Sequence, residues 1–287
     1  MTVSSAPASA AEPRRREGRA RAGPGVGVVG LAAVLGLLLG LPVVVLVGRA
    51  VGGGTLVGAL RGPEVVAALG LSIATTSASL VLTVALGLPL ALVLARGRSG
   101  WVRILEVVVD LPIVLPPAVA GLSLLLVFGR RGLLGGPLDV LGLAIPFTTI
   151  AVVLAQTFVA APFFVRSARS GLQAIDRDLE DAARVDGATE RDVLRWITVP
   201  LASSALAAGL VMSWARALGE FGATIMFAGN VPGRTQTLPL VVYSDFGGGD
   251  LDGSIAAAAI LVLAAAGVLI AVRALHWGRA LDVRAGA

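Results

Sequence analysis

This 287-residue chain lacks several residue types that carry much of enzyme chemistry. It has no Cys, which excludes disulfides, a thiol nucleophile and a cysteine zinc site. It has no Lys, which excludes a Walker A phosphate loop and a Schiff-base lysine. His276 is the single histidine, so clusters of histidine ligands are excluded as well. Any uphill work must therefore draw its energy from a partner chain or from an ion gradient.

Charge is also scarce, because only 14% of the residues are charged and 56% are hydrophobic. Soluble domains carry about 25% charged residues, so the composition predicts a membrane protein. A spanning helix needs about 20 mostly apolar residues. Backbone groups in lipid must be bonded internally, which favours helices. The uncharged runs predict an all-α membrane protein with six transmembrane helices, centred near Leu37, Ser79, Ala120, Val153, Leu210 and Leu263.

Two of these spans have unusual starts. The first follows an Arg-rich lead, but its apolar run is longer than a signal-peptide core, so we interpret it as a retained helix. The third is interrupted by Pro112, Pro116 and Pro117, so its helix is expected to begin near or after Pro117. Residues 1–24 are predicted to be a disordered cytoplasmic tail, and residues 25–280 the membrane domain.

The distribution of arginine predicts the orientation, since cytoplasmic loops collect positive charge. Seventeen of the 23 basic residues fall on the side that holds both termini and the second-to-third and fourth-to-fifth loops. Five fall on the other side, and Arg216 lies inside a span. Both termini are therefore predicted to be cytoplasmic. Anionic lipid accounts for the net charge of +5 without a nucleic-acid partner.

The fourth-to-fifth loop, residues 167–200, is too long and too patterned for a simple connector. Asp176 or Asp178 is a candidate helix cap, and Gly187 stands where a helix-ending residue of positive φ is expected. Thr189 and Asp192 have the spacing of a capping box, with Asp in place of Glu. The pattern predicts a helix, a glycine bend and a second helix. An amphipathic connector that rests on lipid headgroups has the same pattern.

The spacing of the loop resembles the signature loop of bacterial ABC importer permeases. The family form is Glu-Ala-Ala, three residues, Gly, nine residues, Ile, one residue, Leu-Pro. Here Asp replaces Glu and Val replaces Leu, and Glu180 precedes the motif. The resemblance implies that the first helix is a coupling helix, which seats in a separate ATPase subunit. The residues of this coupling loop are Glu180, Asp181, Ala182, Ala183, Gly187, Ile197 and Pro200.

The run from Ala215 to Leu240 is similar to the permeases of molybdate importers, as are Leu111–Pro117 and Phe128–Gly132. This resemblance implies a type I ABC importer permease-like fold. It also implies a homodimer of this chain, an ATPase subunit dimer, an extracytoplasmic molybdate-binding protein and molybdate as the transported ligand, with no cofactor. Sulfate and tungstate stay open as alternative ligands, because a pore can hardly distinguish tetrahedral dianions of similar size.

Polar residues within and beyond the fifth span are candidates for contact with the anion. Arg216 and Glu220 are one helical turn apart, and ionisable groups at membrane depth usually face water or the bundle interior. They either line the translocation path or form an internal ion pair. Thr224 and Asn230 are further path candidates. Candidates for an outer contact with the anion or the binding protein are Arg130, Arg131, Arg234 and Thr235.

Two other classes of function fit less well. A secondary transporter without an ATPase predicts an ionisable relay across several spans, but only Arg216 and Glu220 are clearly deep. An intramembrane enzyme needs a nucleophile with a base, or a metal site. Without Cys or Lys, and with one peripheral His, the chain is predicted to have no catalytic residues and no metal ligands.

Overall fold

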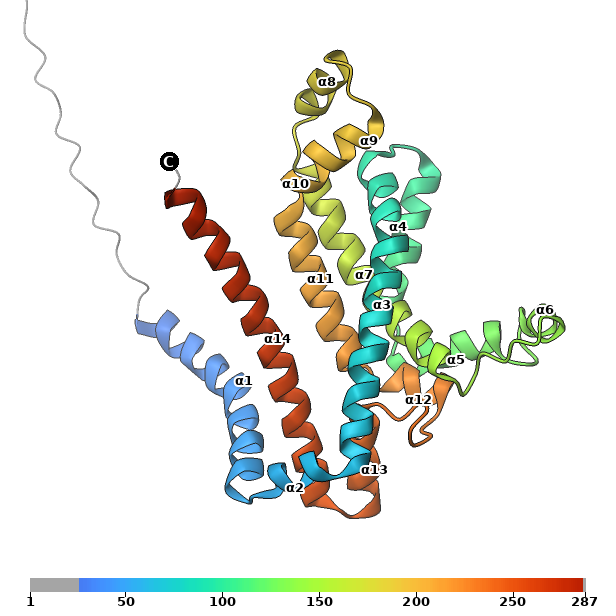
Figure 1. Ribbon diagram of the computed structural model, residues 1–287, viewed down its shortest axis with the longest axis vertical. Helices are drawn as coiled ribbons and strands as arrows, with labels where there is room; N and C mark the ends of the chain where they lie inside the picture. Colours follow the sequence, from blue (N-terminus) through green and yellow to red (C-terminus); the bar gives the residue numbers. More distant parts are fainter. Residues whose placement is uncertain (1–25, 286–287) are drawn as a thin grey trace, which may run out of the picture. The chain divides into compact units, whose positions relative to one another are not determined.

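The computed structural model describes residues 26–285, and every regular element in that range is helical. The predicted tail of residues 1–24 lies outside the described residues, as does the side chain of His276. The elements (Figure 1) are α1 Val26–Gly52, α2 Thr55–Arg61, α3 Pro63–Arg96, α4 Gly100–Val114, α5 Pro117–Phe128, α6 Gly135–Val140, α7 Thr149–Gln173, α8 Arg177–Val185, α9 Glu190–Val193, the π-helix η1 Leu194–Thr198, α10 Val199–Leu201, α11 Ser203–Leu218, α12 Gly222–Ala228, α13 Leu238–Gly248 and α14 Leu251–Ala285.

The chain divides into two units after Val44. The described part of the first unit is the beginning of α1, an apolar helix with exposed Leu and Val side chains. The second unit holds all other elements and every described candidate site residue.

Helices α3 and α7 lie side by side at the centre of the second unit, and α11 packs on α7 (Figure 1). Small residues permit these close approaches. A Cβ on Gly87 would lie 3.0 Å from the Phe164 ring, and one on Gly209 would lie 2.9 Å from Ser167 Cβ. Hydroxyl groups add bonds between helices, such as that from Thr157 to Ser79 at 3.1 Å. Glycine contacts and hydroxyl bonds of this kind stabilise helix pairs in lipid, where burial of apolar surface gives no driving force.

Four described helices are long and apolar enough to cross a membrane by themselves, and a fifth crossing results if α11 is joined to the helix before it. They correspond to the predicted spans near Leu37, Ser79, Val153 and Leu263, and the joined pair to the one near Leu210. That pair, Glu190–Leu201 and Ser203–Leu218, is bent by 72°. The predicted third span is the exception.

The third span is short because prolines interrupt it. As predicted from these prolines, α5 begins at Pro117, but it ends at Phe128 after only 12 residues. Helix α4 precedes it and ends at Val114, so Leu115 and Pro116 separate two helical pieces. Pro116 has no backbone N–H to donate, and its ring interferes with a continuous helix. The predicted count of six transmembrane helices thus depends on whether α4 and α5 cross together.

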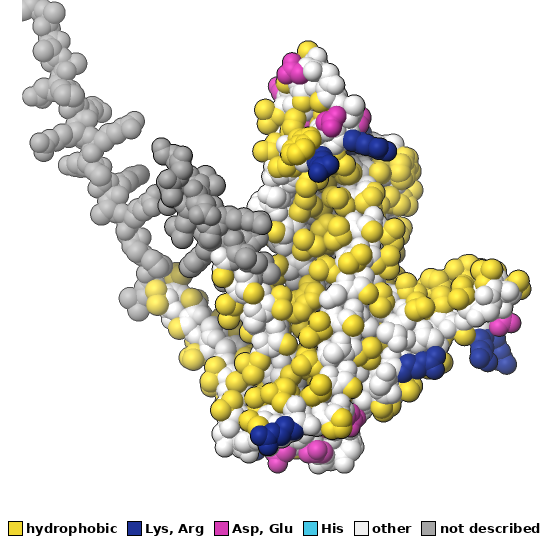
Figure 2. All heavy atoms as spheres, viewed as in Figure 1, with side chains coloured by type: hydrophobic (Ala, Val, Ile, Leu, Met, Phe, Trp, Pro, Cys, Tyr) yellow, Lys and Arg dark blue, Asp and Glu magenta, His cyan; other side chains and the backbone are white. Residues whose placement is uncertain are grey.

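Charged side chains are unevenly distributed over the second unit. On the face drawn in Figure 2, Arg, Asp and Glu lie near the two ends and on the arm that carries α6, while apolar side chains fill the band between them. Such a band is what a helical bundle in a bilayer requires. In addition, α7 continues to Gln173, beyond the predicted start of the cytoplasmic loop, so Arg166 and Arg169 belong to a long apolar helix.

Candidate functional site

The fourth-to-fifth loop folds as the predicted helix, glycine bend and helix. Asp176 caps α8, where its side chain accepts a hydrogen bond from the Asp178 amide at 3.1 Å. Gly187 then adopts φ 92°, a left-handed value that side chains disfavour. Thr189 and Asp192 form a reciprocal capping box at the start of α9. Local sequence chemistry therefore fixes both helix starts and the bend between them.

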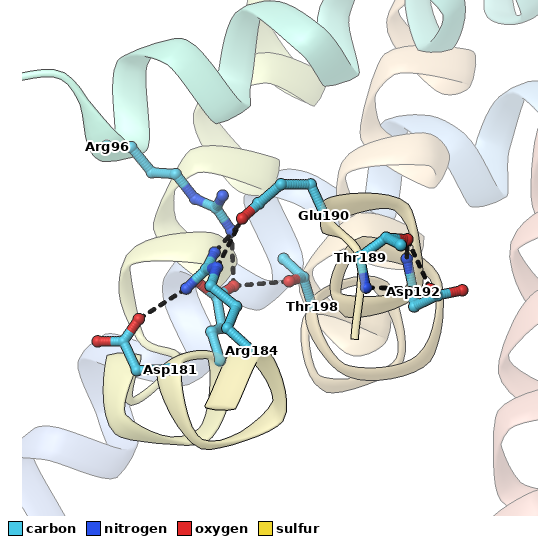
Figure 3. A network of polar contacts seen from close by, with 8 residues as sticks. Arg96, Asp181, Arg184, Thr189, Glu190, Asp192 and Thr198 are labelled. Atoms are coloured by element: carbon cyan, nitrogen blue, oxygen red, sulfur yellow. Dashed lines mark hydrogen bonds and ion pairs between the residues drawn. The ribbon is translucent and has the colours of Figure 1, made fainter. Parts of the chain in front are cut away.

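Arg184 joins the two arms of this loop (Figure 3). Its Nη1 donates to Asp181 Oδ1 at 2.7 Å within α8. Its Nε donates to Glu190 Oε1 at 2.6 Å on α9, and a second bond to Glu190 Oε2 measures 3.2 Å. Because this fork of bonds spans the bend at Gly187, it holds α8 and α9 at one fixed angle.

Glu180 anchors α8 to the membrane helices. Its side chain is buried, and its Oε1 accepts hydrogen bonds from Arg96 Nη2 and Thr198 Oγ1, each at 2.6 Å. Arg96 ends α3 and Thr198 ends η1, as Figure 3 shows for these two donors. A cavity of about 240 Å³, lined in part by Arg96, Arg177 and Glu180, adjoins this junction. One carboxylate thus connects α8 both to the end of α3 and to η1, in the last part of the loop before the fifth span.

The opposite side of α8 is apolar and exposed. Leu179, Ala182 and Val185 are three residues apart in turn, so they share a face, and Val185 is 87% exposed. Ala183 and Ile197 are half-buried, whereas Pro200 is exposed. An exposed apolar stripe on a rigid helix is suited to contact with another protein.

The ion pairs of the loop shift the titration of its carboxyl groups. The hydrogen bond from Arg184 holds the pKa of Glu190 below its usual value, and Glu190 in turn raises the pKa of Arg184. The hydrogen bonds from Thr189 lower the pKa of Asp192. All these groups are charged near neutral pH, so the network is fully formed there.

Arg216 and Glu220 form an ion pair within the fifth span, at 2.7 Å. Glu220 is only 1% exposed, and its Oε1 also accepts a bond from the Ala223 amide at 2.7 Å, at the start of α12. Glu220 therefore stabilises the break between α11 and α12, which favours the internal ion-pair interpretation for this carboxylate. Thr224 is fully buried, and its hydroxyl has no hydrogen-bond partner among the described residues.

The predicted outer residues divide into two groups. Arg130 and Arg234 line one cavity of about 490 Å³, together with Thr148 and Phe147. Arg131 is exposed beside them. Thr235, by contrast, is buried, and its hydroxyl accepts a bond from the Val231 amide at 2.9 Å. Its side chain stabilises the turn in this structure, and its predicted contact with the anion or the binding protein stays a prediction.

Asn230 is held in the same turn region. Its amide nitrogen donates to Ser244 Oγ at 2.6 Å, and its side-chain oxygen is buried without a hydrogen-bond partner in the described part of the chain.

Comparison with known proteins identifies the family. Residues 87–278 match the binding-protein-dependent transport system inner membrane component family. This chain belongs to that family. The molybdenum transport system permease protein ModB of Mycobacterium tuberculosis (strain ATCC 25618 / H37Rv) is 46% identical over 212 residues, which are 74% of this chain and 80% of the relative. ModB of Escherichia coli (strain K12) is 40% identical over 186 residues, covering 64% of this chain and 81% of the relative.

Solved structures have the same fold as this permease. The crystal structure of a bacterial ABC transporter involved in the import of the acidic polysaccharide alginate matches with a TM-score of 0.68 at 19% identity, over 88% of the permease and 94% of that chain. An inward-facing MetNI methionine ABC transporter matches with a TM-score of 0.59 at 20% identity, over 74% and 94%. The permease is thus a multi-pass membrane component of a transport system and not an enzyme, in agreement with the prediction from composition.

Two ion pairs of the permease join α4 to α7. Arg169 of α7 donates to Glu106 of α4, and Arg166 Nε lies 3.7 Å from Asp110 Oδ1. The signal was present, since Glu106 and Asp110 are four residues apart and the arginines three apart. The spacing alone does not predict the pairing, because it does not show that α4 packs against α7.

Proposed function

We propose that this chain is the permease subunit of an ABC importer that takes up molybdate. The observation that carries the proposal is the rigid loop of residues 174–200, which is anchored through Glu180 and presents an exposed apolar helix face. The names of the ModB relatives favour molybdate as the ligand. ATP hydrolysis on a separate ATPase subunit then drives transport, because the chain has no phosphate loop of its own.

In the proposed topology, the chain crosses the cell membrane six times, and both termini lie on the cytoplasmic side. Helices α4 and α5 together make the third crossing, bent at Leu115 and Pro116. The ion pairs from Arg166 and Arg169 neutralise the carboxylates of α4, which makes its insertion less costly. An even number of crossings agrees with the arginine-rich segments lying on one side.

In this proposal the apolar stripe of α8 docks on the ATPase. Two copies of the chain, two ATPase subunits and one extracytoplasmic molybdate-binding protein form the assembly. Closure of the ATPase dimer moves α8, and the connection through Glu180 transmits this motion to α3 and η1. Inverting the populations of inward- and outward-facing states requires about 5 kcal/mol, which favours a rigid loop over a mobile one.

The path in this proposal runs past Arg216, Thr224 and Asn230, with Glu220 holding the break between α11 and α12. Arg130 and Arg234, with Arg131 beside them, receive the anion or the binding protein at the outer surface. These arginine side chains attract the anion but do not form a closed binding site around it, which suits a path that must release its ligand.

Substitution of Val185 by Asp tests the docking of α8. A charge placed in a desolvated apolar contact is unfavourable, so we expect the Val185→Asp permease to lose about 90% or more of the ATPase subunit that co-purifies with wild type. Val140 of α6 is equally exposed and lies far from the loop in the chain, so Val140→Asp is the matched control and should retain the ATPase. Retention of the ATPase by Val185→Asp would refute docking through this face.

Uptake by proteoliposomes tests the function as a whole. The permease reconstituted with its ATPase and binding protein should accumulate molybdate only with ATP, and the permease alone should accumulate none. Unlabelled tungstate and sulfate are then added as competitors. Uptake of sulfate in preference to molybdate would move the assignment to a sulfate importer, and uptake without the ATPase would overturn the coupling mechanism.

A further inference from the structure

The two ion pairs between α4 and α7 differ in the distance between their charged groups and in the exposure of their side chains. The Arg169 guanidinium donates directly to Glu106, and most of its side chain is covered. The Arg166 guanidinium makes only a loose pair, with 3.7 Å between Nε and Asp110 Oδ1. Its side chain is 62% exposed, and that of Asp110 is 39% exposed. Arg166 therefore has donors available for another partner.

Arg166 is placed at membrane depth by the contacts of α7 with α3. Thr157 of α7 donates to Ser79 at the middle of the 34-residue α3, so Arg166, nine residues further along α7, lies about 14 Å from the middle. Another contact gives a second estimate, because Gly87 of α3 faces Phe164 and Val165. Gly87 lies about 11 Å from the middle of the 34-residue α3. Both values are smaller than the half-thickness of the hydrocarbon core, about 15 Å.

Exposed charges at this depth do not face lipid, since ionisable groups in the membrane turn towards water or protein. Arg166 is long enough to extend towards the interface, but the shorter Asp110 side chain is not. A second copy of the chain would have to supply partners for most of the five guanidinium donors, because a guanidinium buried without them is costly in free energy. Water satisfies them all, so it is the favoured surrounding of this face.

We propose that Arg166 and Asp110 face the water-filled cytoplasmic half of the translocation path, where the Arg166 guanidinium contacts the oxyanion as it leaves. The inference rests on the proposed function and adds a contact to the path. A guanidinium fork matches the oxygens of a tetrahedral oxyanion. The Asp110 carboxylate beside it weakens the attraction, so the anion is held briefly and released.

This contact is distinct from the pair in the fifth span. Glu220 is buried, pairs with Arg216 at 2.7 Å and accepts a hydrogen bond from the Ala223 amide, so that carboxylate is engaged within the chain. Arg166 is more exposed, and its carboxylate partner is further away. The accessible guanidinium in the cytoplasmic half of the path is therefore that of Arg166 on α7.

Cysteine labelling tests where Arg166 faces. The native chain has no Cys, so single-cysteine variants give a clean signal and wild type gives the blank. Inside-out vesicles that contain the full assembly are treated with an anionic, membrane-impermeant sulfonatoethyl thiosulfonate. Ser99→Cys, in the exposed turn before α4, is the reference, and Val165→Cys, the buried neighbour, is the matched control. Arg166→Cys should react about 100-fold faster than Val165→Cys and close to the rate of Ser99→Cys.

Slow labelling of Arg166→Cys, at the rate of Val165→Cys, would overturn the inference, because it would place the side chain against lipid or a second copy of the chain.

Chemical rescue tests the contact with the anion. Arg166→Cys should lower the rate of ATP-dependent molybdate uptake about tenfold, through loss of a charge-assisted contact. An aminoethyl thiosulfonate restores a cation at this position and should recover part of the uptake, whereas the sulfonatoethyl reagent should not. Equal rescue by both reagents, or normal uptake before labelling, would overturn the role of the charge.

The two readouts separate this inference from the proposed function. If the wild-type assembly takes up no molybdate, the proposed function fails. The labelling rates depend on no transported anion and still decide whether Arg166 faces water.

Discussion

Glu180 shows how a single side chain connects a surface loop to the membrane helices. Its carboxylate is buried, and one oxygen accepts bonds from both Arg96 and Thr198. Asp181, the next residue, is exposed, and in the described part of the chain it pairs with Arg184 of its own helix. The adjacent acidic residues thus have different roles, since one holds the loop in place and the other stabilises α8 locally.

Replacement of Glu180 by Gln should loosen the loop without unfolding the bundle. Loss of the negative charge weakens the bond from Arg96, by about 1–2 kcal/mol after allowance for the partial exposure of that arginine. We expect faster hydrogen exchange at the amides of residues 177–198 and slower uptake at unchanged levels of protein in the membrane. Asp181→Asn is the control and should affect exchange much less. Equal effects of both substitutions would contradict the anchoring role of Glu180.

At the scale of secondary-structure elements, the angle between α8 and α9 depends on the pair of Arg184 and Glu190. The folded loop lowers the pKa of Glu190, so its stabilising contribution is present above the ordinary Glu value and is lost as the pH falls through the lowered one. A spin label at Val185→Cys should report rising mobility of α8 below pH about 4.3. Glu190→Gln should show this higher mobility already at neutral pH. A pH profile unchanged by Glu190→Gln would show that another group controls the angle.

The sequence predicted elements well where local chemistry decides them. The cap at Asp176, the positive φ of Gly187, the capping box of Thr189 and the helix start at Pro117 all follow from short-range backbone requirements. It did not predict the partners of Glu180 or of Asp110, because those contacts join residues 84 positions apart in one case and 56 in the other. Such pairs depend on how the helices pack, and periodicity within one segment does not contain that information.

The same limit applies to the function of the candidate residues. Thr235 carries a hydroxyl next to an exposed arginine, which from the sequence favours an outer binding role, yet the turn buries it. The sequence predicts that the fourth span ends near Arg166, because a charge marks the end of an uncharged run. The helix continues for two further turns beyond it, and Asp110 and Glu106 of α4 pair with Arg166 and Arg169 there.

At the scale of the whole molecule, α4 and α5 decide how often the chain crosses the membrane. Neither is long enough alone, but their 15 and 12 residues together rise about 40 Å, which exceeds the hydrocarbon thickness of about 30 Å. If they cross as one broken helix, residues on either side of the pair face opposite compartments. Reporter fusions after Arg98 and after Gly142 therefore test the six-crossing topology.

We expect a fused alkaline phosphatase, which is active only outside the cytoplasm, to be inactive after Arg98 and active after Gly142. A fusion after Asp186, in the proposed coupling loop, is the control and should be inactive. The reason is electrostatic, since the loop between α3 and α4 carries Arg96 and Arg98 and is retained on the cytoplasmic side. Inactive enzyme at Gly142 would mean that α5 turns back within the membrane. The number of crossings would then fall below six, and α7 would have to enter from the cytoplasmic side, which would also remove Arg166 from the inner half of the path.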